Sequence, residues 1–540
     1  MLRSEHILKG LGNQYYRATY KSMGFTTEDL KRPLIGIANA WSECVPGHYN
    51  LRQVAQRVKD GIYRAGGTPI EFGVIGGCDG MGQGHDGMHF IMPSRELIAN
   101  SIESMAQINL FDGLVLLGSC DKIVPGMLMA AARLDIPCIF LPGGPMEGGV
   151  EFDGRQADQT SATEAYGMLS AGKITEAEYV ALEDTACPGC GSCSYLGTAN
   201  TMCCLAEALG MSLPGCGLAH AVSAKKRRIA KQSGRRIVAM VKEDLTPRKI
   251  MTREALRNAI RVSMAMGAST NSTLHLPAIA HEAGIHITLD DFDELSREIP
   301  YLCNIKPSGQ YPLSVLEEQG GVPAVMKALE RKLDLEQMTV SGKTVGENLA
   351  GVELVENDVI FSLDHPKKPE GGLAILHGNL APKGAVVKQA GVKPSMHYFE
   401  GQARVFTSME EASWAVSNDK IQKGDVLVIR YEGPKGGPGM REMHMTCSLI
   451  VGRGMDEDCA LVTDGRFSGS TRGPCIGHVS PEAAAGGEIG LLRDGDRIDI
   501  DMDHYTIHAH VTEAEFARRR AEQVMPESWV KGGWLARYQK

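Results

Sequence analysis

Long apolar runs are missing from this sequence, and their absence excludes whole classes of protein. No stretch reaches the ~18 consecutive apolar residues that a membrane-spanning helix needs, so we expect no membrane partner. The opening residues, MLRSEHILKGLGNQYYRATYKS, lack the apolar core of a secretory signal, and we therefore expect a cytoplasmic protein. Positive charge is not in excess either. The 56 Lys and Arg residues face 65 Asp and Glu residues, and the net charge of −9 argues against a nucleic-acid partner.

The composition that is present is that of an ordinary soluble protein. Apolar residues make up 43% and charged residues 22%, which excludes a disordered or collagen-like chain. A length of 540 residues exceeds the ~300 at which single hydrophobic cores stop growing, so two or more domains are expected. The 14 cysteines and 63 glycines still need an explanation. Because cytosolic thiols stay reduced, we interpret the cysteines as buried side chains, metal ligands or nucleophiles.

The N-terminal half alternates strand-like and helix-like patterns. Short apolar runs occur at 34–38, 72–75, 114–117 and 138–141, and apolar residues recur at helical spacing between the first two. This alternation predicts βαβ units and a parallel sheet. A segment rich in Pro, Gly and charge around 358–372 is typical of a domain boundary, and short β-like runs follow it. We therefore expect an α/β domain over residues 1–360 and a β-rich domain over 361–540.

Unusual polar clusters follow each of the four expected strands. These clusters are WSECVPGH, CDGMGQGHDG, CDKIVPG and PMEGG. In open parallel sheets, ligands bind beyond the carboxyl ends of the strands. The four clusters are therefore predicted to converge on one crevice.

Five of the cysteines are candidate metal ligands. Cys78 and Cys120 each precede an aspartate at a strand end, and Cys187, Cys190 and Cys193 form the motif CPGCGSC. Thiolates at such spacing bind an iron–sulfur cluster or a zinc ion. A redox CxxC is disfavoured because no thioredoxin-like pattern surrounds it. The pattern favours metal binding and leaves a tetrahedral zinc site open, while the other cysteines are interpreted as small buried residues.

Asp79 and Asp121 occupy equivalent places after two strands. Hard carboxylate oxygens suit Mg²⁺ or Mn²⁺, although each residue alone could also be a helix cap or a turn residue. Lys122 follows Asp121 directly and could be a charge partner or a modified ligand. Sulfur and oxygen ligands side by side indicate two different metal centres in one pocket.

A glycine pattern in the same region resembles a dinucleotide-binding fingerprint. Gly82, Gly84 and Gly87 have the GxGxxG spacing after a strand. Pro93, however, comes before the next clear helical pattern, and a Cys-Asp pair occupies the strand end. The glycines are therefore better explained by close approach of the backbone to a metal or substrate.

The C-terminal half contains a second group of candidate residues. Glu442 follows the glycine-rich segment YEGPKGGPGM, and Ser468, Ser470, Thr471 and Arg472 lie in the turn-rich segment TDGRFSGSTRG. The GxSxG elbow of hydrolases is absent from this segment. Two interpretations are open: a polar turn between strands, or a hydroxyl and a cation presented to an anionic substrate.

Several long segments together resemble one family. The chain is similar to the dihydroxy-acid dehydratase and phosphogluconate dehydratase family over nearly its whole length. The segments that carry the resemblance are CDGMGQGHDGM, GSCDKIVPGMLMAAARLDIP, CPGCGSCSYLGTANTM, MGASTNSTLHLPAIA, GGLAILHGNLAPKGAVVK, VIRYEGPKGGPGMREM and TDGRFSGSTRGPCIGHVSPEAA. The resemblance implies an N-terminal parallel-sheet α/β domain and a C-terminal β-barrel-like domain, assembled as a homodimer or homotetramer. It also implies dehydration of a 2,3-dihydroxy acid with an iron–sulfur cluster and Mg²⁺.

Residue roles follow from the same resemblance. Asp79, Asp121 and Glu442 resemble the Mg²⁺ ligands of the family. Lys122 resembles a lysine that is carbamylated and ligates Mg²⁺ in some members. Ser468 resembles the serine proposed as the general base that removes the C2 proton.

The cluster ligands are implied by resemblance and by one departure from it. Cys120 and Cys193 resemble cluster ligands. Members with a [2Fe–2S] cluster carry a cysteine where this chain has Gly47, whereas phosphogluconate dehydratases with [4Fe–4S] clusters lack that cysteine and share the CDG of Cys78. We therefore expect Cys78, Cys120 and Cys193 to hold a [4Fe–4S] cluster, with Cys190 in reserve.

The resemblance leaves the substrate open between two classes. C-terminal segments favour 2,3-dihydroxy-3-methylbutanoate, an intermediate of branched-chain amino acid biosynthesis. N-terminal segments such as MGQGHDGMHF lean toward an aldonate or phosphogluconate. Outside the family, the leading alternative is a structural zinc-binding protein, and an NAD-dependent oxidoreductase is the other.

Overall fold

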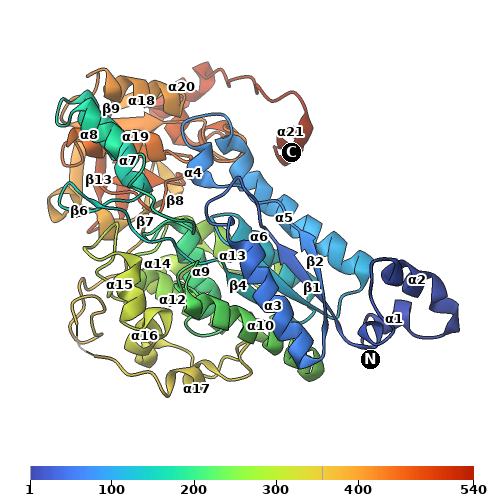
Figure 1. The fold of residues 1–540 in the computed structure, drawn as a ribbon. Helices are drawn as coiled ribbons and strands as arrows, with labels where there is room; N and C mark the ends of the chain where they lie inside the picture. The colour runs from blue at the N-terminus through green and yellow to red at the C-terminus, as the bar shows by residue number, and fades with distance from the viewer. Residues whose placement is uncertain (1, 356, 540) are drawn as a thin grey trace.

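The computed structural model describes residues 2–355 and 357–539, and its two main sheets come from opposite halves of the chain (Figure 1). A parallel sheet lies between residues 34 and 142, and a closed barrel of mixed strands lies between residues 374 and 509. The expected α/β class, with a parallel sheet first and a barrel second, is confirmed. The expected boundary at 360/361 falls between α17 (Val345–Leu349) and β7 (Ala374–Gly378) and stays a prediction.

The first sheet contains all four expected strands. They pair in parallel in the order β2-β1-β3-β4. Strands β1, β3 and β4 are buried along their whole length, as in a sheet covered by helices on both faces. Only β2 differs from expectation, because it begins and ends earlier than the apolar run 72–75. The bounds of the four strands are β1 (Leu34–Asn39), β2 (Thr68–Gly73), β3 (Gly113–Gly118) and β4 (Cys138–Pro142).

The helix between β1 and β2 forms as its sequence pattern predicts. α3 (Leu51–Ala65) buries Val54, Val58 and Ile62 on one face, at the spacing that places side chains on the same side of a helix. It ends at Gly66, whose φ of +85° is the left-handed conformation of a helix C-cap. α3 packs along α10 (Ala224–Glu243), so two helices from distant parts of the chain cover the sheet together.

The strand order creates a binding crevice. The chain moves from β1 outward to β2, then returns across β1 to reach β3 and β4. Because parallel crossovers are right-handed, this reversal places α3 on one face and α5 (Met88–Asn109) with α6 (Ile123–Leu134) on the other. The carboxyl ends of β1 and β3 therefore flank a topological switch point, where ligands bind in such sheets.

One expectation for this region is wrong. Pro93 lies inside α5, which begins at Met88, so the proline does not separate the glycine segment from the helix. A proline removes one backbone hydrogen bond of a helix. The burial of Met88, Ile91 and Met92 around it outweighs that loss. Gly82 ends the short helix α4 (Asp79–Gly82) rather than opening α5.

A layer of helices follows the first sheet and separates it from the barrel in sequence. Among the described residues, every helix is too short or too polar to span a bilayer. The main helices of this layer are α9 (Thr198–Ala208), α12 (Arg253–Met266), α13 (Ser272–Glu282), α14 (Leu289–Glu298), α15 (Leu313–Glu318) and α16 (Gly321–Ala328).

The barrel closes in the order β10-β11-β12-β8-β7-β14-β13-β9. Its interior is apolar, and a further apolar cluster packs between the barrel and its helices α18 (Met409–Ser417) and α19 (His444–Arg453). The remaining strands are β8 (Ala381–Val387), β9 (Tyr398–Phe406), β10 (Asp425–Ile429), β11 (Ala460–Thr463), β12 (Cys475–Gly477), β13 (Arg497–Asp501) and β14 (Thr506–Ala509).

One helix of the N-terminal half packs directly on the barrel half. α7 (Gln159–Ser170) lies beside α19 (Figure 1). The two backbones touch through glycine: a Cβ added to Gly452 would lie 2.1 Å from the Glu164 carbonyl oxygen. This close contact brings α7 to the edge of the crevice between the two halves.

Candidate active site

A cavity of about 540 Å³ lies where the two halves of the chain meet. It contains the strand-end residues of the first sheet and residues from two loops of the barrel half. Seven of the predicted site residues line it: Cys78, Asp79, Cys120, Asp121, Cys193, Glu442 and Ser468. Of the four strand-end clusters that were predicted to converge, those after β2 and β3 line the cavity, although β1 separates these two strands; in the described structure the clusters after β1 and β4 do not belong to its lining.

Local structure aims the strand-end residues at the cavity. Cys78 is the N-cap of α4, so Asp79 begins that helix. Cys120 follows β3 with a φ of +68°, a left-handed conformation that is uncommon for a residue with a side chain. Such strain is found mostly at functional sites. The turn at Cys120 leads through Asp121 and Lys122 into α6.

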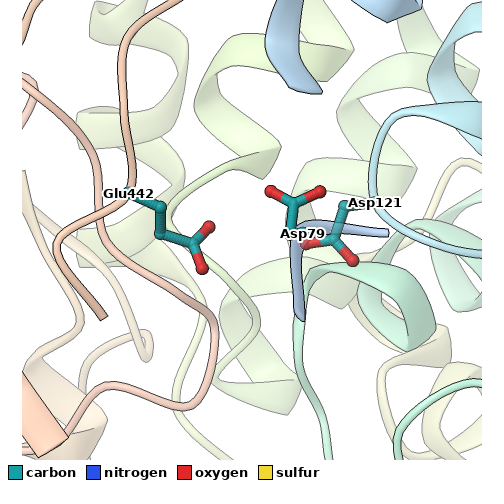
Figure 2. Close-up of side chains that lie close together, drawn as sticks. All are labelled: Asp79, Asp121 and Glu442. Carbon is teal, nitrogen blue, oxygen red and sulfur yellow. The ribbon is translucent and has the colours of Figure 1, made fainter. Parts of the chain in front are cut away.

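Three carboxylates converge in the cavity. Asp79, Asp121 and Glu442 each offer one oxygen, and these oxygens lie within 4.8 Å of one another. In Figure 2 the Glu442 carboxylate faces the two aspartates from the opposite ribbon, so both halves of the chain contribute. Asp79 and Glu442 are buried, at 4% and 1% exposure.

Two buried cations balance part of this charge. Lys122 Nζ donates to Asp79 Oδ2 at 2.9 Å and lies 3.9 Å from Asp121. Arg466 donates to Asp79 Oδ2 at 2.8 Å and also pairs with Glu442. Both cations are fully buried. Arg466 is a site residue that sequence reasoning missed, although it lies in the segment TDGRFSG, two residues before Ser468.

The carboxyl groups of this cluster outnumber its cations. Asp79, Asp121 and Glu442 face only Lys122 and Arg466. Burial, and then the negative charge of Asp79, raise the pKa of Asp121 well above its usual range. Burial opposes ionisation of Asp79, but Lys122 and Arg466 outweigh it and lower the pKa. Among the described residues Asp79 Oδ1 has no hydrogen-bond partner, so the donor set fits a hard divalent cation.

Three thiols gather beside the carboxylates. The Cys120 thiol lowers the pKa of Cys78, while the pKa of Cys120 is raised well above its usual range by Cys78 and by burial. Burial, and then the negative charge of Cys78, raise the pKa of Cys193. Cys193 Sγ lies 3.5 Å from Gln159 Oε1. Three converging sulfurs fit a soft metal centre that favours thiolates.

Other residues of the thiol motifs lie outside this group. Neither Cys187 nor Cys190 lines the cavity in the described structure, and Cys187 is exposed. Gly47 reaches the thiols from the loop after β1: a Cβ there would lie 2.8 Å from Cys120 Sγ. A side chain at position 47 would therefore point at the sulfur group.

Ser468 lies in the loop between β11 and β12, within a short hydrogen-bonded chain. Ser470 donates to Ser468 Oγ from its hydroxyl at 2.9 Å and from its backbone N–H at 3.3 Å. His444 Nδ1 lies 3.2 Å from Ser470 Oγ, and burial lowers the pKa of this histidine. Lys388 Nζ holds the same loop by donating to the Gly469 carbonyl at 2.6 Å. Two donors directed at one oxygen favour its deprotonated form.

None of the three predicted substrate-binding residues, Ser470, Thr471 and Arg472, belongs to the cavity lining in the described structure. Thr471 is buried, and its hydroxyl has no partner among the described residues. Arg472 pairs with Glu164 and lines a neighbouring cavity. Contact of either residue with substrate stays a prediction, as does that of Ser470.

An apolar wall forms part of the cavity lining. It was not predicted, because its residues come from α7, α8 (Glu176–Ala181) and α19, where no motif distinguishes them from ordinary helix residues. The rings of Tyr166 and Tyr179 lie 6.2 Å apart, centroid to centroid. Ala162 and Met445 extend the wall. The cavity lining therefore combines ionic groups with aliphatic and aromatic side chains.

Comparison with known proteins agrees with this arrangement. The family model described as dihydroxy-acid/6-phosphogluconate dehydratase N-terminal matches residues 32–348, and the corresponding C-terminal model matches residues 358–540. The chain is 52% identical to dihydroxy-acid dehydratase 1 of Methanosarcina acetivorans, with 100% of this chain and 98% of the relative covered. It is also 52% identical to the dihydroxy-acid dehydratase of Caldanaerobacter subterraneus, covering 99% and 97%. The chain belongs to the dihydroxy-acid/6-phosphogluconate dehydratase family.

Proposed function

We propose that this protein is a hydro-lyase that dehydrates 2,3-dihydroxy-3-methylbutanoate to 3-methyl-2-oxobutanoate, a step of branched-chain amino acid biosynthesis. One observation carries the proposal: three carboxylates, three thiols and Ser468 line a single cavity. The names of the relatives, all dihydroxy-acid dehydratases at about half identity over full length, support it.

The metal ligands are proposed from the donor chemistry. Asp79, Asp121 and Glu442 would hold Mg²⁺ or Mn²⁺, because carboxylate oxygens suit hard divalent cations. Lys122 could join them only after carbamylation, because an ammonium group has no lone pair to donate. As an ammonium it is the charge partner of Asp79.

Cys78, Cys120 and Cys193 would hold an iron–sulfur cluster, and [4Fe–4S] is favoured over [2Fe–2S]. Gly47 supports this choice, because the position that points at Cys120 Sγ carries no fourth thiol here. With three protein ligands, a four-iron cluster would keep one iron without a protein ligand. When bound, the cation and the open iron would supply Lewis acidity for the substrate oxygens and the departing hydroxide.

The chain's own residues supply the proton chemistry. The C2 hydrogen, alpha to a carboxylate, is weakly acidic, so its removal needs a base in contact with it. Ser468 Oγ is the proposed base, and the two donors of Ser470 stabilise its alkoxide. The carbon–hydrogen electron pair then forms the enol as hydroxide leaves C3, and the enol becomes the 2-keto acid.

The apolar wall supports the aliphatic substrate over an aldonate. Tyr166, Tyr179, Met445 and Ala162 can pack against the methyl groups on C3. The hydroxyl chain of a sugar acid gains less from these apolar contacts, because its polar groups lose water when they pack against them. An aldonate or phosphogluconate therefore remains the second candidate, favoured only by N-terminal sequence segments.

A 2-keto-acid assay on anaerobically purified protein tests the function. We expect turnover of 2,3-dihydroxy-3-methylbutanoate and at least about tenfold lower kcat/KM for gluconate and 6-phosphogluconate. Ser468→Ala should lower kcat by about 10²–10⁴-fold, the usual contribution of a general base, with unchanged metal content. Wild-type turnover in Ser468→Ala would remove the base assignment, and faster turnover of an aldonate would reverse the substrate order.

Metal analysis of the same preparation tests the cofactors. We expect iron and acid-labile sulfide, and visible absorption of a [4Fe–4S] cluster. Cys78→Ser should lose iron, whereas Cys190→Ser, a matched thiol outside the cavity lining, should keep it. Zinc without sulfide would favour the structural zinc alternative, and a [2Fe–2S] spectrum would overturn the cluster type.

The location and the assembly of the protein follow from the family resemblance. We propose a cytoplasmic homodimer or homotetramer, in agreement with the family resemblance. Light scattering of the purified holoprotein tests the assembly directly, because a mass of one chain at micromolar concentration contradicts it.

A further inference from the structure

Arg472 has no role in the cavity described above, although it follows Ser468 closely in the chain. It lines a second cavity of about 770 Å³, together with residues of the hairpin β5 (Glu151–Phe152) and β6 (Arg155–Gln156) and of the loop 306–312. Helix α7 separates the two cavities: Thr163 faces the first, while Glu164 pairs with Arg472 of the second.

Positive charge is concentrated in this second cavity. Arg155, Lys306 and Arg472 all line it, and Glu164 accepts from both arginines. In the described lining these three cations face one carboxylate, that of Glu151, while Glu164 and Asp158 lie outside the lining and act on the cations from there. Lys306 is 7% exposed and donates only one hydrogen bond in the described structure, to the Gln156 carbonyl at 2.7 Å.

The three cations are close enough to affect one another. Burial lowers the pKa of Lys306; the negative charge of Asp158 opposes this effect, and the positive charges of Arg155 and Arg472 add to it. A partly buried lysine held near two arginines is stabilised by an anion between them. Two N–H bonds of its ammonium group are available for such an anion.

The rest of the lining selects a hydrophilic ligand. Apart from the charged groups and Gln156 and Gln310, the lining consists of glycines and prolines. No leucine, isoleucine, valine, methionine or aromatic side chain belongs to it in the described part of the chain. A ligand with a branched aliphatic tail would find no apolar contact there, unlike in the first cavity.

We propose that this second cavity is a binding site for a phosphate group. Planar guanidinium groups match phosphate oxygens with paired hydrogen bonds, and an ammonium group adds a point charge. The phosphate oxygens would accept from Lys306 and from the arginine N–H groups that Glu164 leaves free. The group can arrive as inorganic phosphate or as a phosphate monoester, and both share this chemistry.

Calorimetric titration of the holoprotein at constant ionic strength tests the proposal. The probes are inorganic phosphate, glycerol 3-phosphate and 3-methyl-2-oxobutanoate. We expect phosphate to bind, and Lys306→Met to weaken this binding at least about tenfold. Lys383→Met is the matched control, because Lys383 lines a different cavity, and it should change the affinity less than twofold. Tighter binding of one phosphate probe than the other identifies the source of the group.

Arg155→Met provides a second variant that does not depend on Lys306. Arg155 belongs to a surface hairpin, so its substitution is expected to leave the fold intact. Arg155→Met should weaken phosphate binding several-fold even if Lys306→Met unfolds. The proposal fails if phosphate does not bind at millimolar concentration. It also fails if phosphate binds both variants as tightly as the wild type, because phosphate would then bind at the proposed metal site of the first cavity. It also fails if the keto acid displaces phosphate. No readout here depends on turnover, so failure would leave the proposed function untouched.

Discussion

At the scale of single residues, Arg466 illustrates how a buried charge can hold two halves of a chain together. Its guanidinium contacts Asp79 from the N-terminal half, and Glu442 and the Met440 carbonyl from the barrel half. All of these groups are buried. Removing one partner of a buried ion pair leaves the others desolvated and unpaired, which costs more than the pair itself contributes.

Arg466→Met should therefore destabilise the protein strongly. We expect the free energy of unfolding of the metal-free protein to fall by about 3–5 kcal/mol, because Asp79 and Glu442 lose their shared donor. Denaturant titration measures this loss. Arg493→Met is the control: Arg493 pairs with Glu522 at the surface, where such pairs contribute less than about 1 kcal/mol. Equal losses in the two variants would contradict the argument.

Lys388 provides a residue-scale prediction about pH. Burial lowers the pKa of the Lys388 ammonium group to about 7, whereas in the unfolded chain its pKa is about 10.4. Between these values the unfolded chain binds a proton that the folded chain does not, so this residue makes stability rise with pH across that window.

Lys388→Met should reduce the rise of folding stability with pH. We expect the variant to lose a contribution of roughly 4 kcal/mol that the wild type gains between pH 7 and pH 10. Chemical denaturation at several pH values, compared with Lys9→Met at an exposed position, measures the difference. Parallel stability curves for wild type and Lys388→Met would show that the ammonium group is not buried as described.

At the scale of elements, the contact between α7 and α19 determines the shape of the cavity. α7 supplies Gln159, Thr163 and Tyr166 to the lining, and α19 supplies His444 and Met445. Gly452 lets the two backbones touch, because any side chain there would meet the Glu164 carbonyl at 2.1 Å. The helices therefore act as one wall across the two halves of the chain.

Gly452→Val should push this wall apart. We expect a loss of about 1–3 kcal/mol or more in unfolding free energy, as for other overpacked sites, together with a raised KM. Thermal unfolding and the 2-keto-acid assay measure the two effects. Gly351→Val is the matched control, because a Cβ at Gly351 meets nothing within 4 Å. An unchanged KM in Gly452→Val would show that α7 does not shape the substrate end.

At the scale of the whole molecule, a divalent cation would join the two halves. Asp79 and Asp121 follow strands of the first sheet, while Glu442 belongs to a loop of the barrel half (Figure 2). A ligand that binds only the folded protein stabilises it by RT ln(1 + [L]/Kd), about 2.7 kcal/mol at one hundred times Kd. Mg²⁺ should therefore raise the unfolding midpoint of metal-free protein.

Asp121→Asn should greatly reduce the stabilisation of the protein by Mg²⁺. Without metal the variant should be at least as stable as the wild type, because burial and Asp79 penalise the Asp121 charge. With Mg²⁺ it should gain much less than the wild type. Calorimetry with and without Mg²⁺ measures both, and Asp293→Asn, at a surface pair with Arg297, controls for the lost charge. A full Mg²⁺ response in Asp121→Asn would remove this residue from the ligand set.

The sequence could predict features that depend on neighbours along the chain. Apolar runs specified the four strands of the first sheet, and residues 51–65 showed helical spacing because one face of α3 is buried. Cys78-Asp79 and Cys120-Asp121 were recognisable as strand-end pairs for the same reason. Pro93 misled the prediction, since its local cost is small beside the packing of α5.

The sequence by itself therefore determined the alternating α/β pattern, the β-rich second half, the family, and the residue types available for a metal centre. Only the tertiary structure decided which of them meet. It brought Arg466 between Asp79 and Glu442, placed Tyr166 and Tyr179 in the same cavity as the carboxylates, and directed Arg472 toward a second cavity. The physical reason is that these contacts join residues from 24 to 387 positions apart. Their energies depend on burial and charge in three dimensions rather than on spacing along the chain.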